Sequence, residues 1–233
     1  MRRRAILLLT TMAAALVMAS GVAWAATVYC TSGATYCSGT NNDDLIYGTS
    51  GVDKIEPREG DDVIRAYGGN DIVRTHSDDS GSNTVYAGSG NDAVNGKIGN
   101  DYLYGQSDDD ALSGWDGNDR LYGGAGLDKL NGGGFIDYLY GEGGNDLSLS
   151  GGYGNDYLLG GPGRDYLQGD YGDDRLIGDL DPDFIDGYYG EDRIWARDGS
   201  MDTIYCGPGT DTVMSADITE NLISSDCEFV TRF

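Results

Sequence analysis

Aspartate recurs every nine residues along most of this 233-residue chain, and the spacing resumes after one added residue near Ser150 and another near Ser200. Before Asp92 the segment Thr75 to Ser82 also adds residues, and Asn83 stands where an aspartate is expected. Carboxylate oxygens are ligands that hard divalent cations prefer. The spacing therefore predicts a periodic set of metal-ligating side chains, which are Asp44, Asp53, Asp62, Asp71, Asp92, Asp101, Asp110, Asp119, Asp128, Asp137, Asp146, Asp156, Asp165, Asp174, Asp183, Asp192, Asp202 and Asp211.

The residues around each aspartate define a nine-residue unit. An Ile, Leu or Val stands two residues after nearly every aspartate, with Ser148 as the exception, and a glycine usually stands two residues before it. The segments Gly96–Tyr104 and Gly151–Leu159 show the complete pattern. We interpret the unit as a six-residue turn followed by a three-residue strand whose middle side chain points inward.

Such a short strand cannot bury an apolar side chain alone, so it must stack on copies of itself. Turns that alternate between two edges place every second repeat in the same sheet. The predicted fold is all-β, a parallel β-roll forming a right-handed solenoid with two repeats per turn. Stacked turns leave little room for a Cβ at the first and fourth turn positions, or require positive φ there, and bulkier residues predict distorted turns at Asn42, Asp109, Phe135 and Asp181.

This unit resembles the RTX, or haemolysin-type, calcium-binding repeat, whose pattern is Gly-Gly-x-Gly-x-Asp-x-aliphatic-x. The resemblance covers about residues 39 to 214. It implies that the turn aspartates named above, together with backbone carbonyls of two stacked turns, enclose several Ca²⁺ ions. Such repeats often accompany a protease, lipase, epimerase or toxin domain and a C-terminal secretion signal. We find neither pattern here and transfer neither association.

Electrostatics independently favours a divalent cation. The formal net charge is −24, and Asp101 should face Asp119 across one rung, about 4.8 Å away. Two bare carboxylates at that distance repel by about 3.5 kcal/mol at an effective dielectric constant of 20. Ca²⁺ accepts 6 to 8 oxygens in flexible geometry, whereas Mg²⁺ requires a tight octahedron.

The alternative is that the aspartates only cap turns. The best-formed sites should lie between Gly96 and Trp195, because Pro57 and Ala66 replace the first glycine of earlier repeats.

The chain ends suggest export. Residues 1–25 contain Arg2–Arg4, an apolar run and Ala23-Trp24-Ala25, the pattern of a secretory signal peptide. Removing this segment lowers the charge by three, from −24 to −27, so nucleic acid and anionic lipid are not expected partners. We predict a secreted, extracellular protein without a transmembrane segment in the mature chain. Its parts would be an N-terminal cap (26–38), the calcium-binding β-roll (39–214) and a C-terminal cap (215–233).

Four cysteines lie in two sequence-local pairs, and exported proteins meet an oxidising compartment where disulfides persist. Four cysteines allow three connectivities. We predict Cys30 with Cys37 and Cys206 with Cys227, fastening the two caps.

Tyr104, Tyr122 and Tyr140 recur at every second repeat and should form a ladder on one outer face. The functional alternative is a platform for sugar rings, with Trp115 and Trp195 contributing. Cell-surface glycans or proteins are the macromolecular partners that this face suggests.

Catalytic motifs are missing from the sequence. His76 is the single histidine and sits in the insertion, and neither HExxH nor GxSxG occurs. We therefore predict a non-enzymatic structural or interaction protein at the cell surface or in the matrix. The alternatives are a polysaccharide epimerase or lyase, which would need a Lys, Arg or His poised among carboxylates, with Arg120 and Lys129 as the nearest candidates, and a plain extracellular calcium buffer.

Overall fold

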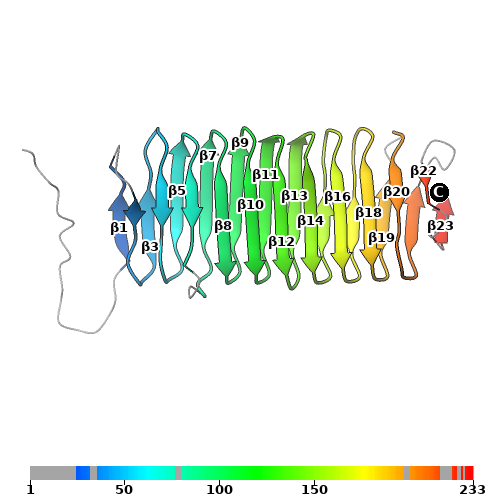
Figure 1. Ribbon diagram of the computed structural model, residues 1–233, viewed down its shortest axis with the longest axis horizontal. Helices are drawn as coiled ribbons and strands as arrows, with labels where there is room; N and C mark the ends of the chain where they lie inside the picture. The colour runs from blue at the N-terminus through cyan, green and yellow to red at the C-terminus, as the bar shows by residue number, and fades with distance from the viewer. Residues whose placement is uncertain are drawn as a thin grey trace, which may run out of the picture.

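The computed structural model describes residues 25–31, 36–76, 80–196, 200–215, 222–224, 227 and 229–232. These residues form an elongated stack of short strands in two parallel sheets, and they contain no helix (Figure 1). No helix among them could therefore span a membrane. The predicted signal peptide, apart from Ala25, lies outside the described residues.

Odd-numbered strands form one sheet, called sheet A, and even-numbered strands form the other, called sheet B. Sheet A contains, in spatial order, β1 (Ala26–Tyr29), β3 (Asp44–Tyr47), β5 (Val63–Gly68), β7 (Thr84–Ser89), β9 (Tyr102–Ser107), β11 (Arg120–Gly126), β13 (Tyr138–Gly144), β15 (Tyr157–Leu159), β17 (Arg175–Ile177), β19 (Arg193–Ala196), β21 (Thr212–Ser215) and β23 (Phe229–Arg232). Sheet B contains β2 (Cys37–Ser38), β4 (Lys54–Glu56), β6 (Ile72–Arg74), β8 (Ala93–Ile98), β10 (Ala111–Asp116), β12 (Lys129–Gly134), β14 (Ser148–Tyr153), β16 (Tyr166–Tyr171), β18 (Phe184–Tyr189), β20 (Thr203–Tyr205) and β22 (Leu222–Ile223).

The pairing register follows the predicted translation of two repeats. Leu121 pairs with Leu103 on one side and with Leu139 on the other, two repeats away in each direction. The insertion at Thr75–Ser82 lengthens one step, so Ile64 pairs with Val85 and not with Ser82. The predicted all-β parallel β-roll with two repeats per turn is thus confirmed.

The core is a single column of aliphatic side chains between the two sheets. Each is at most 3% exposed, and the members are Ile46, Ile55, Ile64, Val73, Val85, Val94, Leu103, Leu112, Leu121, Leu130, Leu139, Leu149, Leu158, Leu167, Leu176, Ile185, Ile194, Ile204 and Val213. Ser148 pairs with Lys129, and Leu149 pairs with Leu130 and fills the core. The added residue of this repeat is therefore accommodated at Leu147, whose side chain is 52% exposed. The sequence pattern predicts this addition slightly later, near Ser150.

The segments predicted as caps extend the two sheets. β1 and β2 pair in parallel with β3 and β4, and β22 and β23 pair with β20 and β21. Both predicted disulfides, Cys30–Cys37 and Cys206–Cys227, are present. At the N-terminal end the disulfide joins the end of β1 in sheet A to β2 in sheet B. It closes the first rung covalently.

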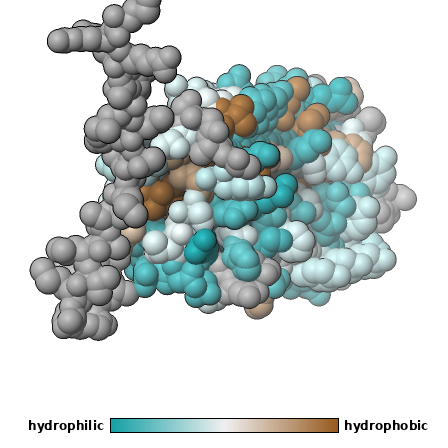
Figure 2. Space-filling model, turned by 60° about the vertical axis from the view of Figure 1, so that its left-hand side comes forward, coloured by the Kyte–Doolittle hydropathy of each residue, from teal (hydrophilic) through white to brown (hydrophobic). Residues whose placement is uncertain are grey.

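The outer face of sheet A carries the predicted tyrosine ladder. Tyr86, Tyr104, Tyr122 and Tyr140 stack with ring centroids 4.7 to 4.9 Å apart and interplanar angles of 5 to 9°. Ring stacking at the rung spacing stabilises neighbouring strands. In the view of Figure 2 the surface is mainly hydrophilic, with hydrophobic residues scattered among polar ones. The aliphatic residues are thus mostly enclosed by the sheets.

Candidate metal centres

The predicted aspartates lie in two buried rows, one along each edge of the roll. Those from Asp62 to Asp211 are at most 3% exposed. In each row the backbone N–H of one aspartate donates to Oδ1 of the aspartate on the next rung, as from Asp110 to Asp128 at 2.8 Å and from Asp156 to Asp174 at 2.7 Å. This ladder fixes each carboxylate inside its turn and commits one of its two oxygens.

The second carboxylate oxygen is buried and, in much of the described chain, accepts no hydrogen bond. This holds for Oδ2 of Asp71, Asp92, Asp110, Asp119, Asp128, Asp137, Asp146, Asp156, Asp165, Asp174 and Asp192. A buried polar atom without a partner costs roughly 1 to 3 kcal/mol, and more when it is charged. A whole series of such atoms requires a shared positive partner or protonation.

Glycine at the first turn position opens the space that these oxygens face. A Cβ added to Gly123 would lie 2.5 Å from Oδ2 of Asp128 and 2.8 Å from the carbonyl oxygen of Gly141 on the next rung. The φ of Gly123 is not in the left-handed region, so space and not backbone conformation excludes a side chain. Equivalent pairs of oxygens converge beside Gly105, Gly132, Gly141, Gly151, Gly160, Gly169 and Gly187.

Positive φ is required at the second and fourth turn positions, and the requirement at the second was not expected from the sequence. Non-glycine residues also adopt positive φ at the second position: Arg58, Tyr67, Lys97, Gln106, Trp115, Glu142, Asp170, Asp179 and Tyr188. At the fourth position Phe135 and Asp181 have φ of 81° and 77°, whereas the glycines that adopt positive φ there range from 109° to 154°. The turns at these two residues therefore differ from the glycine turns in this lower φ. The prediction was wrong for Asp109, because Asp108 occupies the fourth position of that turn and has a φ of 76°. Asn42, at the fourth position of the first turn, does not have positive φ.

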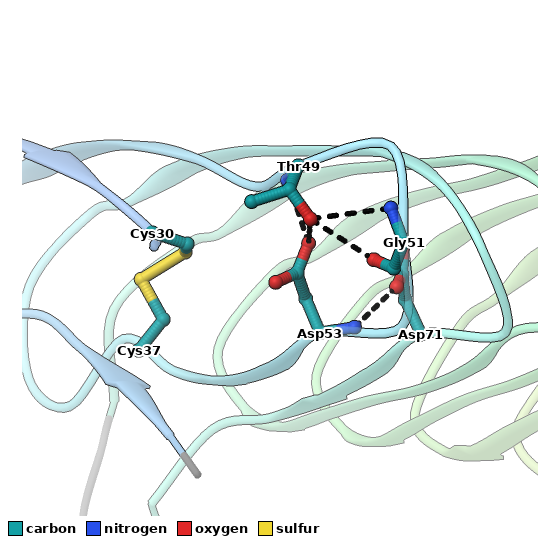
Figure 3. Close-up of a disulfide and its surroundings, with 6 residues drawn as sticks. All are labelled: Cys30, Cys37, Thr49, Gly51, Asp53 and Asp71. Atoms are coloured by element: carbon teal, nitrogen blue, oxygen red, sulfur yellow. Dashed lines mark hydrogen bonds between the residues drawn. A yellow bond between two sulfur atoms is a disulfide. The ribbon is translucent and has the colours of Figure 1, made fainter. Parts of the chain in front are cut away.

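The first two repeats satisfy their carboxylates differently, as Figure 3 shows for the second of them. Thr49 occupies the second turn position, and its backbone N–H donates to Oδ2 of Asp53 at 2.6 Å. Its hydroxyl lies 3.0 Å from the same oxygen. Thr40 likewise donates its N–H to Oδ2 of Asp44 at 2.5 Å. Both threonines lack the positive φ of later repeats. These two turns cap their own aspartates without an added cation.

Burial raises the pKa of the uncapped aspartates well above the ordinary value of 3.8. It is about 8 for Asp110, Asp137 and Asp174. Desolvation is the largest cause, the hydrogen bond from the preceding rung opposes it, and neighbouring aspartates raise the pKa further. The buried carboxylates of the two rows therefore strongly favour binding either a proton or a cation.

The donor set fits calcium better than other metals. Among the described residues no three His, Cys, Asp or Glu side chains converge on one point. A cation between two turns would therefore be held by one or two carboxylates together with backbone carbonyls. Ca²⁺ accepts such mixed oxygen sets, whereas Zn²⁺ and Cu²⁺ favour imidazole or thiolate. The aspartate rows offer neither of those, because the cysteines of the described chain form disulfides and His76 is exposed on the insertion.

A model of the RTX calcium-binding nonapeptide repeat matches residues 38–73, 77–103, 96–130, 122–147, 150–185, 168–200 and 178–213. The chain belongs to the RTX calcium-binding repeat family. No curated protein was found that matches it. The matched RTX segments run from the second strand to the end of the core column, close to the range 39–214 expected from the sequence. The turns described above are thus RTX turns, which generally bind calcium.

Other singled-out residues occupy distinct places in the RTX roll. Asn83 takes the aspartate position of its rung, where its Oδ1 accepts the N–H of Asp62 at 3.1 Å. Arg120 begins β11 in sheet A, whereas Lys129 begins β12 in sheet B. These two candidate residues therefore lie on opposite faces and cannot act on one substrate together. Trp115 lies on β10 of sheet B and not on the face of the tyrosine ladder, and its ring centroid is 3.9 Å from Nζ of Lys97.

Proposed function

We propose that this RTX protein is a calcium-ordered structural and interaction module of the extracellular space. The observation that carries the proposal is the series of buried Oδ2 atoms that accept no hydrogen bond, most of them beside a glycine and near a carbonyl oxygen of the next rung. Bound Ca²⁺ supplies the positive charge that these oxygens need. The chain's own residues position the oxygens, exclude water from them and keep the two rows in register.

The proposed ligands are the predicted aspartates from Asp62 to Asp211. Support is most direct for those with an uncapped Oδ2, from Asp71 to Asp192. Asp44 and Asp53 are assigned a turn-capping role instead, because Thr40 and Thr49 already donate to them. In this proposal the N-terminal rungs, closed by the Cys30–Cys37 disulfide, form without calcium and present a preformed edge on which calcium-dependent rungs assemble.

Three features support an exported, non-catalytic role. The signal-peptide pattern in residues 1–25 and the two disulfides fit an oxidising compartment. The candidate cationic residues of an epimerase or lyase, Arg120 and Lys129, lie on opposite sheets. Ordering by calcium is favoured over simple buffering because the ligand oxygens are buried between rungs, so that binding and rung stacking are one event.

The sharpest test replaces one buried carboxylate and one exposed carboxylate. Asp146→Asn removes the charge of an uncapped aspartate, whereas Asp116→Asn makes the same charge change at an exposed turn residue. We expect Asp146→Asn to bind at least one Ca²⁺ fewer per chain, or to bind it at least tenfold more weakly, in calorimetric titration and equilibrium dialysis. Asp116→Asn should match the unmodified protein. Equal losses in both variants would refute the ligand assignment.

A further inference from the structure

The two outer faces of the roll differ in charge. In sheet A, from β3 to β21, the outward positions on either side of each core residue contain no Asp or Glu. They contain four arginines, Arg65, Arg120, Arg175 and Arg193. The equivalent positions of sheet B include Glu56 and Asp186. A strip of flanking positions without acidic side chains but with four guanidinium groups is unexpected in a chain of net charge −24. The exposed Glu142 of β13 lies beyond this strip.

Aromatic rings hold three of these arginines in place. The Arg120 guanidinium lies 5.1 and 5.2 Å from the ring centroids of Tyr102 and Tyr138, and its Nη1 donates to the Tyr102 hydroxyl at 2.6 Å. Arg175 lies 5.4 Å from the Tyr157 centroid and 4.2 Å from the Trp195 centroid. A guanidinium fixed against rings loses little conformational freedom when it binds an anion.

The described part of the chain gives these arginines no carboxylate partner. Arg65, the remaining ring-held member, lies 5.3 Å from the Tyr86 centroid. Guanidinium groups bind carboxylates and sulfate-type anions through two parallel hydrogen bonds. The face is therefore provided with anion-binding groups that the carboxylates of the described residues do not occupy.

The shape of the face selects a narrow, linear anion. The strip formed by each core residue and its two neighbours measures about 10 Å along the strand direction. Arg65, Arg120 and Arg175 stand on β5, β11 and β17, each three rungs apart, or about 14 Å. Exposed acidic residues such as Asp61, Asp173 and Glu191 lie in the turns beside the face. These turns would repel a bilayer surface or a duplex nucleic acid, whereas a single chain along the roll axis avoids them.

We propose that the outer face of sheet A binds a linear acidic polysaccharide along the roll axis, with the four arginines contacting its carboxylate or sulfate groups. The tyrosine ring faces are occupied by ladder neighbours at 4.7 to 4.9 Å. Sugars therefore meet ring edges and not ring faces, and charge directs the contact. The proposal rests on the proposed function only in requiring that calcium has folded the roll.

The test compares two charge-matched triple variants of the full chain in saturating calcium. Arg65→Gln/Arg120→Gln/Arg175→Gln alters sheet A, and Lys54→Gln/Arg74→Gln/Lys129→Gln removes the same charge from sheet B. Probes are hyaluronate, which carries carboxylates, chondroitin sulfate, which adds sulfates, and neutral dextran as a control. We expect tight binding of at least one acidic polymer, no dextran binding, a loss of at least tenfold in the sheet A variant and less than twofold in the sheet B variant.

Several results would overturn the proposal. These are acidic polymers binding no better than dextran, equal losses in both triple variants, or tighter binding of duplex DNA or phosphatidylserine vesicles. Circular dichroism of each variant with calcium separates a folding failure from a binding failure. Arg193→Gln, which changes no ring contact described above, supplies a milder variant that should still weaken binding. A roll that folds with calcium but binds no acidic polymer would contradict this inference and leave the proposed calcium-dependent folding standing.

Discussion

Gly141→Ala will destabilise the calcium-loaded protein by about 3 kcal/mol or more, whereas Gly143→Ala will change its stability by less than about 0.5 kcal/mol. A Cβ on Gly141 would collide with Oδ2 of Asp146 and would lie 2.5 Å from the carbonyl oxygen of Gly160. The Asp146 carboxylate is held through its Oδ1 by the N–H of Asp128, and the Gly160 oxygen belongs to the backbone of the next rung, so neither oxygen can move away cheaply. At Gly143 the nearest atom to an added Cβ is the carbonyl oxygen of Gly124, 3.8 Å away.

Neither glycine has a positive φ, so backbone strain does not distinguish the two variants. Urea unfolding in calcium, followed by circular dichroism, measures both free energies. Calcium titration should also show a weakened site in Gly141→Ala only. Similar stabilities for the two variants would mean that the space beside Gly141 is not needed for calcium or for stacking.

Without calcium, the roll will be more stable at pH 5 than at pH 8. Folding raises the pKa of Asp110, Asp137 and Asp174 from 3.8 to about 8, and that of Asp71, Asp146 and Asp192 to about 7. Between about pH 4 and pH 8 the folded state therefore binds more protons than the unfolded chain, so the free energy of unfolding falls as pH rises. This stabilisation is complete below pH 3.8 and is lost as pH increases through 6 to 8.

Calcium should reverse this trend, because Ca²⁺ and protons compete for the same oxygens. The far-ultraviolet β signal of chelated protein at pH 5 and pH 8 gives the first comparison, and urea midpoints in saturating calcium at the same two pH values give the second. We expect the β signal to fall with pH in chelator and the urea midpoint to rise with pH in calcium. A β signal that rises with pH in chelator would show that the buried carboxylates are already neutralised by the protein.

The nine-residue period was sufficient to predict the roll, the core column and the aspartate rows, because translation by two repeats determines each residue's neighbours. Leu121 between Leu103 and Leu139 follows from spacing alone. At Ser148 the period failed locally, because the single added residue at Leu147 places Leu149 in the core. The sequence does not reveal at which residue the addition is accommodated. The sheet to which each repeat belongs also follows from alternation, and it separates Arg120 from Lys129.

The chemistry within each turn was less predictable. Whether a carboxylate oxygen is capped or left for a cation depends on backbone conformation at the second turn position, which the period does not encode. Thr40 and Thr49 were the available signal, because threonine often caps a turn with its own N–H and hydroxyl. The arginine contacts on sheet A also depend on side-chain placement. Their dependence on aromatic partners became visible only with the structure.

Far-ultraviolet circular dichroism of the chelated protein at neutral pH, titrated with Ca²⁺ and separately with Mg²⁺, tests the central claim most directly. We predict a cooperative gain of β signal with Ca²⁺ and little change with Mg²⁺, because buried carboxylates must be neutralised before rungs stack. A residual β signal before calcium should reflect the capped N-terminal rungs. A spectrum that is fully folded in chelator and unchanged by Ca²⁺ would contradict calcium-dependent folding of the roll.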